Sequence, residues 1–147
     1  MKLEVSNILK DHGVRSTKVR EAVLRLLIDE GHPLSHSEMS TKKEISEFDR
    51  VTVYRTLEVL HEAHLIHQVK GTDGISRFGA NLDQSSQKCT GDHIHFLCSD
   101  CHKMTCLPEQ ALPWIKAPKG FEIHSKQLVV HGKCSSCGKK SKGGTKK

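Results

Sequence analysis

Aromatic residues are scarce in this chain of 147 residues, which has one tryptophan, one tyrosine and four phenylalanines. The core must therefore be mainly aliphatic, and a small domain with a thin core gains from a metal ion that holds it together. Long apolar runs are also absent, so no stretch is predicted to span a membrane. No signal-peptide pattern occurs near the N-terminus, and we expect a cytoplasmic protein whose cysteines bind metal rather than form disulfides.

Positive charge is concentrated at the C-terminal end. The formal net charge is +6, but the five lysines after Gly138 leave only +1 for residues 1–138. Residues 1–80 carry twelve basic and twelve acidic side chains. Net charge therefore does not show whether the protein binds nucleic acid. That question depends on where individual charged residues lie. We expect residues 139–147 to form a disordered lysine-rich tail.

Four of the six cysteines form two Cys-x-x-Cys pairs, Cys98 with Cys101 and Cys134 with Cys137. Thiolates at this spacing can bind the same ion, and four of them complete the tetrahedral shell that Zn²⁺ favours. A thioredoxin-type redox pair is disfavoured, because no strand-to-helix pattern surrounds either pair. The sequence therefore predicts a structural zinc site that closes the ends of a small domain.

Two histidines precede the first cysteine pair. In an extended strand, His93 and His95 share one face, whereas Ile94 and Phe96 share the other. We expect the apolar face to pack and the two imidazoles to stand together opposite it. Paired histidines beside a thiolate site favour a second metal site, and the alternative is a solvated face.

The first 80 residues have the pattern of a winged helix-turn-helix. Apolar periodicity and capping residues predict helices over 2–10, from Ser16 or Thr17 to Gly31, over 36–45 after a Ser35–Glu38 capping box, and over 50–63 after Asp49. Two strand-like runs, 65–70 and 75–78, are joined by the turn 71–74.

The helix over residues 50–63 has an unusual exposed side. A solvated face is normally rich in Lys and Glu, but here the first turns expose methyl groups, a hydroxyl and a guanidinium. These groups suit the major groove of DNA, and the alternative is an ordinary packed helix. This pattern predicts DNA contacts for Val51, Thr52 and Arg55, and Tyr54 lies at the edge of the same face. Lys70 and Arg77 flank the hairpin, where we expect phosphate contacts.

The second half is predicted to be a small α+β domain. Residues 81–91 are polar and aperiodic and are interpreted as a hinge that contains Cys89. Strands are expected over 92–98, 103–107 and 121–131, with a short helix that Pro108 opens.

Together these motifs resemble the ferric uptake regulator family of bacterial metal-responsive repressors, over nearly the whole chain. The resemblance rests on Asp49-Arg50-Val51-Thr52-Val53-Tyr54-Arg55-Thr56-Leu57, on Asp92-His93-Ile94-His95-Phe96-Leu97-Cys98 with Cys101, on Gly132-Lys133-Cys134-Ser135-Ser136-Cys137, and on Gly13-Val14-Arg15-Ser16-Thr17 with Arg20.

The resemblance implies a homodimer that binds operator DNA. Each subunit would have a winged-helix domain (1–80), a hinge (81–91) and a C-terminal dimerisation and metal-binding domain (92–138). Tyr54 and Arg55 match the DNA-contacting pair of the family, and Arg15 matches a basic position near the minor groove. The two cysteine pairs match the structural zinc ligands of many members.

The family's sensory metal site is where this sequence departs from the pattern. His93 and His95 match two ligands, whereas the acidic ligand after the wing falls on Gly79 and a glutamate falls on Cys106. A further ligand is expected from Cys89, His36 or His32. A thiolate favours Zn²⁺ over Fe²⁺ or Mn²⁺. The alternative for Cys106 is a buried small residue with no ligand role.

The predicted function is that of a metal-dependent transcriptional repressor, with structural Zn²⁺ and a second divalent ion, Zn²⁺ or Fe²⁺, at the sensory site. A thiol- or peroxide-responsive regulator of the same family is the alternative. A zinc hydrolase is disfavoured, because four thiolates leave no open coordination position and no His-Glu-x-x-His motif occurs. We expect no enzyme activity and no small-molecule ligand other than metal ions.

Overall fold

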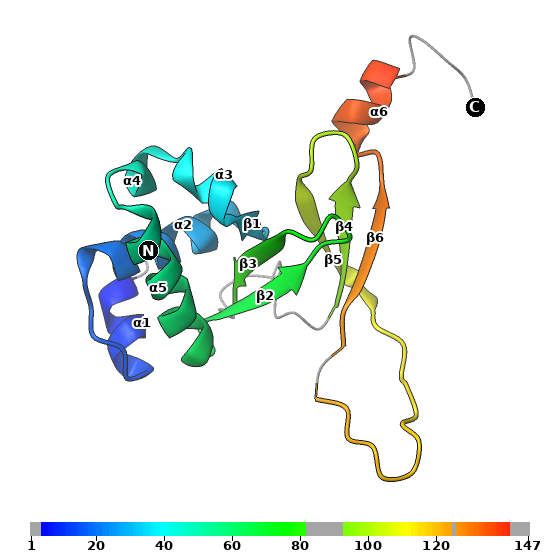
Figure 1. Cartoon of the computed structure of the whole chain (residues 1–147), viewed down its shortest axis with the longest axis horizontal. Coiled ribbons are helices and arrows are strands. Elements are labelled where there is room, and N and C mark those ends of the chain that lie inside the picture. The colour runs from blue at the N-terminus through cyan, green and yellow to red at the C-terminus, as the bar shows by residue number, and fades with distance from the viewer. Residues whose placement is uncertain (1–3, 82–92, 125, 142–147) are drawn as a thin grey trace.

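The computed structural model describes residues 4–81, 93–124 and 126–141. Five helices and a small sheet form the N-terminal half, and a second sheet with one short helix forms the C-terminal half (Figure 1). The hairpin of the first sheet reaches across to the second sheet (Figure 1). Within the described ranges, no helix combines the length and the apolar character needed to cross a membrane.

The N-terminal helices largely follow the predicted pattern. They are α1 (Val5–Asp11), α2 (Lys18–Glu30), α3 (His36–Ser40), α4 (Lys43–Ser46) and α5 (Arg50–Glu62). The side chain of Thr17 caps α2, and the predicted capping box of Ser35 and Glu38 opens α3.

The single helix predicted over 36–45 is wrong, because α3 ends at Ser40 and α4 begins at Lys43. The hydroxyls of Ser40 and Thr41 donate to the carbonyls of His36 and Glu38, at 3.0 and 2.7 Å. The backbone N–H groups of Thr41 and Lys42 donate to carbonyls three residues back, at 3.2 and 3.0 Å, so the chain leaves the α-helical pattern here.

The first sheet has three antiparallel strands, β1 (Leu34–Ser35), β2 (Ile66–Lys70) and β3 (Ser76–Ala80), in the order β1-β3-β2. The hairpin of β2 and β3 is the predicted wing, and its strands pair from Ile66 with Ala80 to Lys70 with Ser76. Helices α1 to α5 and this sheet enclose the main hydrophobic core, to which α2 contributes Val23, Leu24, Leu26 and Leu27, and α5 contributes Val53, Leu57 and Leu60.

The second sheet contains β4 (His93–Cys98), β5 (Met104–Ala111) and β6 (Leu128–Gly132), in the order β5-β4-β6. Strand β4 is antiparallel to β5 and parallel to β6. The helix predicted after Pro108 is wrong, since β5 continues through this residue to Ala111. The strand predicted from Phe121 begins only at Leu128.

Helix α6 (Ser135–Ser141) begins directly after Cys134 and contains Cys137. It extends three residues into the segment that was predicted to be a disordered tail. The rest of that tail, and most of the predicted hinge, lie outside the described residues.

The buried face of β4 is not the one predicted from its apolar alternation. His95 and Leu97 have only 1% and 3% of their surface exposed, whereas Ile94 and Phe96 are half-buried. The reason is tertiary: the wing packs on the histidine face, where Val69 of β2 meets Leu97. The imidazole of His95 therefore lies at the joint between the two halves of the molecule.

Candidate metal centres and DNA-reading helix

The four cysteines predicted to bind zinc are brought together by the fold. Cys98 ends β4, Cys101 lies in the turn after it, and Cys134 and Cys137 lie at the start of α6. Their sulfur atoms all lie within 4.8 Å of one another. The sulfur atoms of Cys101 and Cys134 are 3.9 Å apart. Zinc–sulfur bonds of about 2.3 Å give tetrahedral edges of about 3.8 Å, so the four cysteines fit structural zinc.

The electrostatics of the cluster also favour a cation. Backbone N–H groups of Cys101 and Cys134 donate to the Cys98 sulfur at 3.5 and 3.4 Å and lower the pKa of this thiol to about 6. The neighbouring Cys134 thiol is the main group that raises the pKa of Cys137, to about 12. Cys137 is therefore held in the thiol form by its neighbours, and a divalent cation would remove this conflict because it favours the thiolate.

Two of the predicted sensory residues are neighbours across the second sheet. His95 on β4 pairs directly with Cys106 on β5, so their side chains point to the same face of the sheet. Cys106 is half-buried. The side chain of His93 and all of Cys89 lie outside the described residues. In the described part of the chain, the four-cysteine cluster is the only set of three or more such donors that lies within this distance.

The structure adds His67, a residue that the sequence analysis missed. His67 lies on β2 of the wing, and its ring centroid is 6.0 Å from that of His95. Two imidazoles on one tetrahedral ion, with metal–nitrogen bonds of about 2.1 Å, have centroids about 5.3 Å apart. A small approach of the two rings would therefore let them share an ion.

The surroundings of His67 explain why Gly79 occupies the position of the family's acidic ligand. A Cβ atom at Gly79 would lie 2.9 Å from Cε1 of His67, so glycine makes the room that the imidazole occupies. The Nδ1 atom of His67 donates to Oδ1 of Asn81 at 2.6 Å, and Nδ2 of Asn81 donates to the His64 carbonyl, which fixes the amide. A hydrogen bond at Nδ1 is the usual way to orient Nε2 towards a metal. The glycine at position 79, where the family has an acidic ligand, was the sequence signal that another ligand, such as His67, takes its place.

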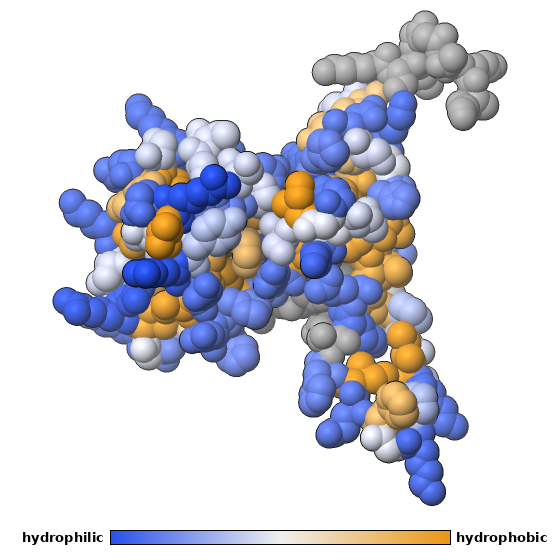
Figure 2. Space-filling model, in the orientation of Figure 1, coloured by the Kyte–Doolittle hydropathy of each residue, from blue (hydrophilic) through white to orange (hydrophobic). Residues whose placement is uncertain are grey.

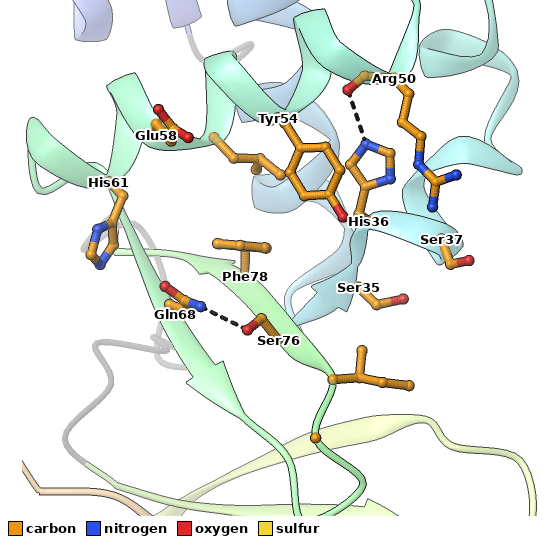
Figure 3. A pocket seen from close by; sticks show the side chains of 13 residues that line it. Ser35, His36, Ser37, Arg50, Tyr54, Glu58, His61, Gln68, Ser76 and Phe78 are labelled. Atoms are coloured by element: carbon orange, nitrogen blue, oxygen red, sulfur yellow. Dashed lines mark hydrogen bonds between the residues drawn. The ribbon is translucent and has the colours of Figure 1, made fainter.

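His36, predicted as a possible sensory ligand, lies elsewhere. Its ring stacks on Tyr54 and its Nε2 atom donates to the backbone carbonyl of Arg50 at 3.3 Å (Figure 3). His32 is also engaged locally, since its Nδ1 atom lies 2.9 Å from the Glu30 carbonyl. Both contacts of His36, with Tyr54 and Arg50, are with residues of α5. We therefore do not propose His36 as a sensory ligand.

Helix α5 exposes the predicted base-reading residues. Val51, Tyr54 and Arg55 are exposed and Thr52 is half-buried, while Val53, Leu57 and Leu60 of the same helix lie in the core. Asp49 occupies the N-cap position, but its carboxylate accepts from the Thr52 hydroxyl rather than from a backbone N–H. Arg15 and Lys70 are exposed as well.

Arg77 does not contact phosphate as predicted, because only 1% of its surface is exposed. Its guanidinium forms a two-pronged ion pair with Asp73, at 2.9 and 3.1 Å, and donates to the carbonyl of His102 at 3.0 Å. A Cβ atom at Gly71 would lie 2.5 Å from this guanidinium, so the wing turn leaves space for it. Arg77 therefore ties the wing to the turn beside the cysteine cluster.

A second polar contact joins the two halves at Gln127. Its side-chain amide accepts from the Lys70 N–H and donates to the Gln68 carbonyl, each at 3.3 Å. Because β2 is an edge strand of its sheet, these backbone groups face outwards and the amide pairs with them as a neighbouring strand would. The wing is thus held to the C-terminal half by Arg77, Gln127 and the apolar contact of Val69 with Leu97.

Comparisons with known proteins agree with this arrangement. The sequence model of the ferric uptake regulator family matches residues 11–131. The chain is 30% identical to the ferric uptake regulation protein of Bacillus subtilis, over 88% of this chain and 89% of that protein. It is 28% identical to the peroxide operon regulator of the same organism, over 93% of each. A solved zinc uptake regulator complexed with zinc and DNA shares its fold, with a TM-score of 0.62 and 21% identity, over 93% of this chain and 92% of that one.

Proposed function

Because this chain belongs to the ferric uptake regulator family of metal-responsive transcriptional regulators, we propose that it is a repressor that binds operator DNA when a sensory metal ion is bound. Proteins of this family are transcription factors rather than enzymes, and they typically bind operator DNA as dimers. In this proposal, the four cysteines Cys98, Cys101, Cys134 and Cys137 bind structural zinc. The signal is the binding of a second divalent ion at the sensory site.

The observation that carries the proposal is the approach of His67 to His95. His67 belongs to the wing and His95 to the C-terminal sheet, so an ion shared by them would join the DNA-binding half to the other half. Such an ion fixes the angle at which a dimer presents its two reading helices. Metal then binds the DNA-competent form more tightly and shifts the population towards it.

The proposed sensory ligands are His67, His95 and Cys106, with His93 and Cys89 as the candidates that complete the set. His95 and Cys106 face the same side of the second sheet, and His67 approaches that side from the wing. One thiolate among imidazoles favours Zn²⁺ over Fe²⁺ and Mn²⁺, which prefer harder ligands.

On the DNA side, we assign base contacts to Val51, Thr52, Tyr54 and Arg55 at the first turns of α5. Their exposure on a helix whose other face lies in the core supports this assignment. Exposed Arg15 and Lys70 supply contacts to the DNA backbone, which position the protein without selecting sequence.

An exposed apolar surface of the C-terminal half supports the proposal of a homodimer. Residues 112–124 project from the body of the protein and carry apolar side chains (Figure 2). Trp114 and Phe121 have 81% and 69% of their surface exposed, and Leu128 and Val130 of β6 are exposed beside them in sequence. Apolar surface of this extent marks an interface, and a second copy of the chain is the partner that the family suggests.

The deciding experiment measures metal-dependent DNA binding of His67→Ala and His95→Ala, with His131→Ala as the control at an exposed position on β6. We expect both test variants to keep one zinc ion per chain in the cysteine cluster and to need at least about tenfold more Zn²⁺ to bind DNA. His131→Ala should respond like the wild type. Wild-type metal sensitivity of both test variants would refute the proposed sensory site.

The variant Cys106→Glu tests the choice of metal. A carboxylate is a harder ligand than a thiolate, so the preference should move from Zn²⁺ towards Fe²⁺ or Mn²⁺. The measurement is the concentration of each ion that gives half-maximal DNA binding. An unchanged order of the three ions would exclude Cys106 as a ligand.

A peroxide-responsive regulator is the second candidate, and the position of one thiol together with a sequence similarity favours it. The half-buried thiol of Cys106 lies opposite His95, and the chain is similar to a peroxide operon regulator. Mass spectrometry after treatment with hydrogen peroxide separates the two functions. Reversible oxidation at Cys106 or Cys89 that releases DNA while structural zinc stays bound supports the peroxide response, and release by zinc chelation alone supports the metal response.

A further inference from the structure

His36 forms a stacked pair with Tyr54 on the DNA-reading side of the winged helix. Their ring centroids are 4.0 Å apart and their planes differ by 10°. The two partners differ in exposure, because 6% of the His36 surface and 46% of the Tyr54 surface are accessible. The imidazole is therefore a buried platform, and the partly exposed phenol ring lies against it (Figure 3).

The platform is fixed from two sides. His36 is the first residue of α3, whose N-terminus is closed by the capping box of Ser35 and Glu38. Its Nε2–H donates to the backbone carbonyl of Arg50, the first residue of α5, at 3.3 Å. The ring thus links the start of α3 to the start of the reading helix.

The hydrogen bonds also define the tautomer. A carbonyl only accepts, so the proton must be on Nε2 of His36. The Nδ1 atom is buried, and no described residue forms a hydrogen bond with it. The imidazole therefore presents a flat ring of defined orientation to Tyr54.

Tyr54 borders an open cleft of about 600 Å³ between α5 and the wing. Arg50 and Glu58 of α5 line one side of the cleft, and Gln68 and Ser76 of the wing line the other (Figure 3). An unsupported tyrosine at the rim of such a cleft would sample several rotamers. The stacked His36 ring restricts these choices before DNA arrives, which lowers the ordering cost of binding.

From this geometry we propose that His36 is a positioning residue for operator recognition, which holds the Tyr54 ring in the orientation that meets a base. The inference rests on the proposed DNA-binding function and deepens it. His36 acts through Tyr54 and does not itself touch DNA, so its removal lowers the preference for the operator rather than general affinity for DNA.

The test is a double-mutant cycle in the zinc-loaded, full-length protein, with His36→Ala, Tyr54→Ala and the combined variant. The probes are a duplex that the wild-type protein selects from a random library and a scrambled duplex of equal length. We expect His36→Ala to weaken binding to the selected duplex about three- to tenfold, the value of one aromatic stacking contact. Binding to the scrambled duplex should not change. In the Tyr54→Ala background, His36→Ala should have no further effect.

A matched pair of variants separates stacking from mere filling of space. Phenylalanine and leucine at position 36 both fill the site, but only phenylalanine can stack on Tyr54. His36→Phe should keep most of the operator preference and His36→Leu should lose it, even if His36→Ala proves too unstable to measure. Thermal unfolding and zinc content of each variant identify any that are not folded.

Four results would overturn the inference. They are losses that add up fully in the cycle, equal losses on the selected and scrambled duplexes, equal behaviour of His36→Phe and His36→Leu, and wild-type binding of the selected duplex by Tyr54→Ala. Failure of the proposed function is distinct from these, because the zinc-loaded wild-type protein would then select no duplex at all. If Tyr54→Ala binds the selected duplex like the wild type, the role of His36 is refuted while the other reading residues of α5 remain candidates.

Discussion

The two halves of the molecule are stabilised by different means. In the described part of the chain, sixteen buried apolar residues form one cluster in the N-terminal half. The second cluster has three, Val69, Leu97 and Met104, and one of these comes from the wing. Each buried aliphatic side chain contributes about 1.5–3 kcal/mol, so the first half has a hydrophobic core of ordinary size and the second half does not.

This difference indicates what the C-terminal half depends on. A three-stranded sheet with few buried side chains is marginal in water unless something else holds it. Here the four thiolates close one end of the sheet and the wing covers one face. On the proposed function, structural zinc and contact with the wing thus take the place of a hydrophobic core in this half.

The largest expected effect comes from breaking the cysteine cluster. Cys101→Ser removes one of four ligands, and structural zinc sites of this kind contribute about 10–16 kcal/mol of apparent binding free energy. We expect zinc content to fall from one ion per chain to near zero in protein without sensory metal. Amide hydrogen exchange should rise throughout β4, β5 and β6 while α2 and α5 stay protected, and the dimer should dissociate.

Cys106→Ser is the matched control for this prediction, because Cys106 lies outside the cluster. It should keep its structural zinc and its protection pattern. A Cys101→Ser protein that remained dimeric and as resistant to heat as the wild type would show that the C-terminal half does not depend on its metal.

The next effect concerns the joint between the halves. Arg77→Ala removes a buried guanidinium that binds Asp73 and the His102 carbonyl, and loss of one partner of a buried pair costs about 3–5 kcal/mol. Urea unfolding should show a loss of this order. Arg25→Ala, which removes a half-buried arginine of α2, should cost far less. Equal losses in the two variants would mean that Arg77 does not connect the halves.

A smaller effect is expected at the reading surface, which should act without changing the stability of either half. Arg55→Ala should weaken operator binding by about 1–3 kcal/mol if Arg55 meets a base edge. Its melting temperature and zinc content should equal those of the wild type, because Arg55 is exposed. Losses that are equal on specific and non-specific DNA, with a shallower dependence on salt, would assign Arg55 to phosphate instead.

The smallest effect is the pH dependence of the stability that the ion pair of Arg77 and Asp73 contributes at the joint. The guanidinium of Arg77 is the main cause that lowers the pKa of Asp73 from 3.8 to about 2. The folded state therefore favours the charged carboxylate, and its contribution is present above pH 3.8 and lost as the pH falls through about 2. Urea unfolding of the wild type and Asp73→Asn should differ at neutral pH and converge in acid. A constant difference down to pH 2 would contradict this account.

Several features of the fold and the site followed from local sequence. The capping box at Ser35 and the apolar period of α5 identify helices through contacts between neighbours in the chain. The cysteine pairs identify a zinc site because the spacing alone brings two thiolates together. The exposure of Val51 and Arg55 was predicted from the same helical period.

Two of the incorrect predictions share a different cause. Arg77 was predicted to contact phosphate, yet the C-terminal half covers it and supplies the His102 carbonyl. The long strand predicted from Phe121 is limited to the residues that pair with β4, from Leu128 onwards. In each case, contact with a distant segment decided the outcome, and local propensity does not report such contacts.

The sequence by itself determined the helix periods, the wing, the four thiolates and the side chains that α5 exposes, because each depends on residues a few positions apart. Only the tertiary structure decided that the histidine face of β4 is buried, that His67 approaches His95, and that His36 lies beneath Tyr54. These three arrangements join segments between 18 and 28 positions apart or across the two halves, as the residue numbers show. Their physical basis is the docking of the wing on the second sheet and of α3 on α5, which no local pattern specifies.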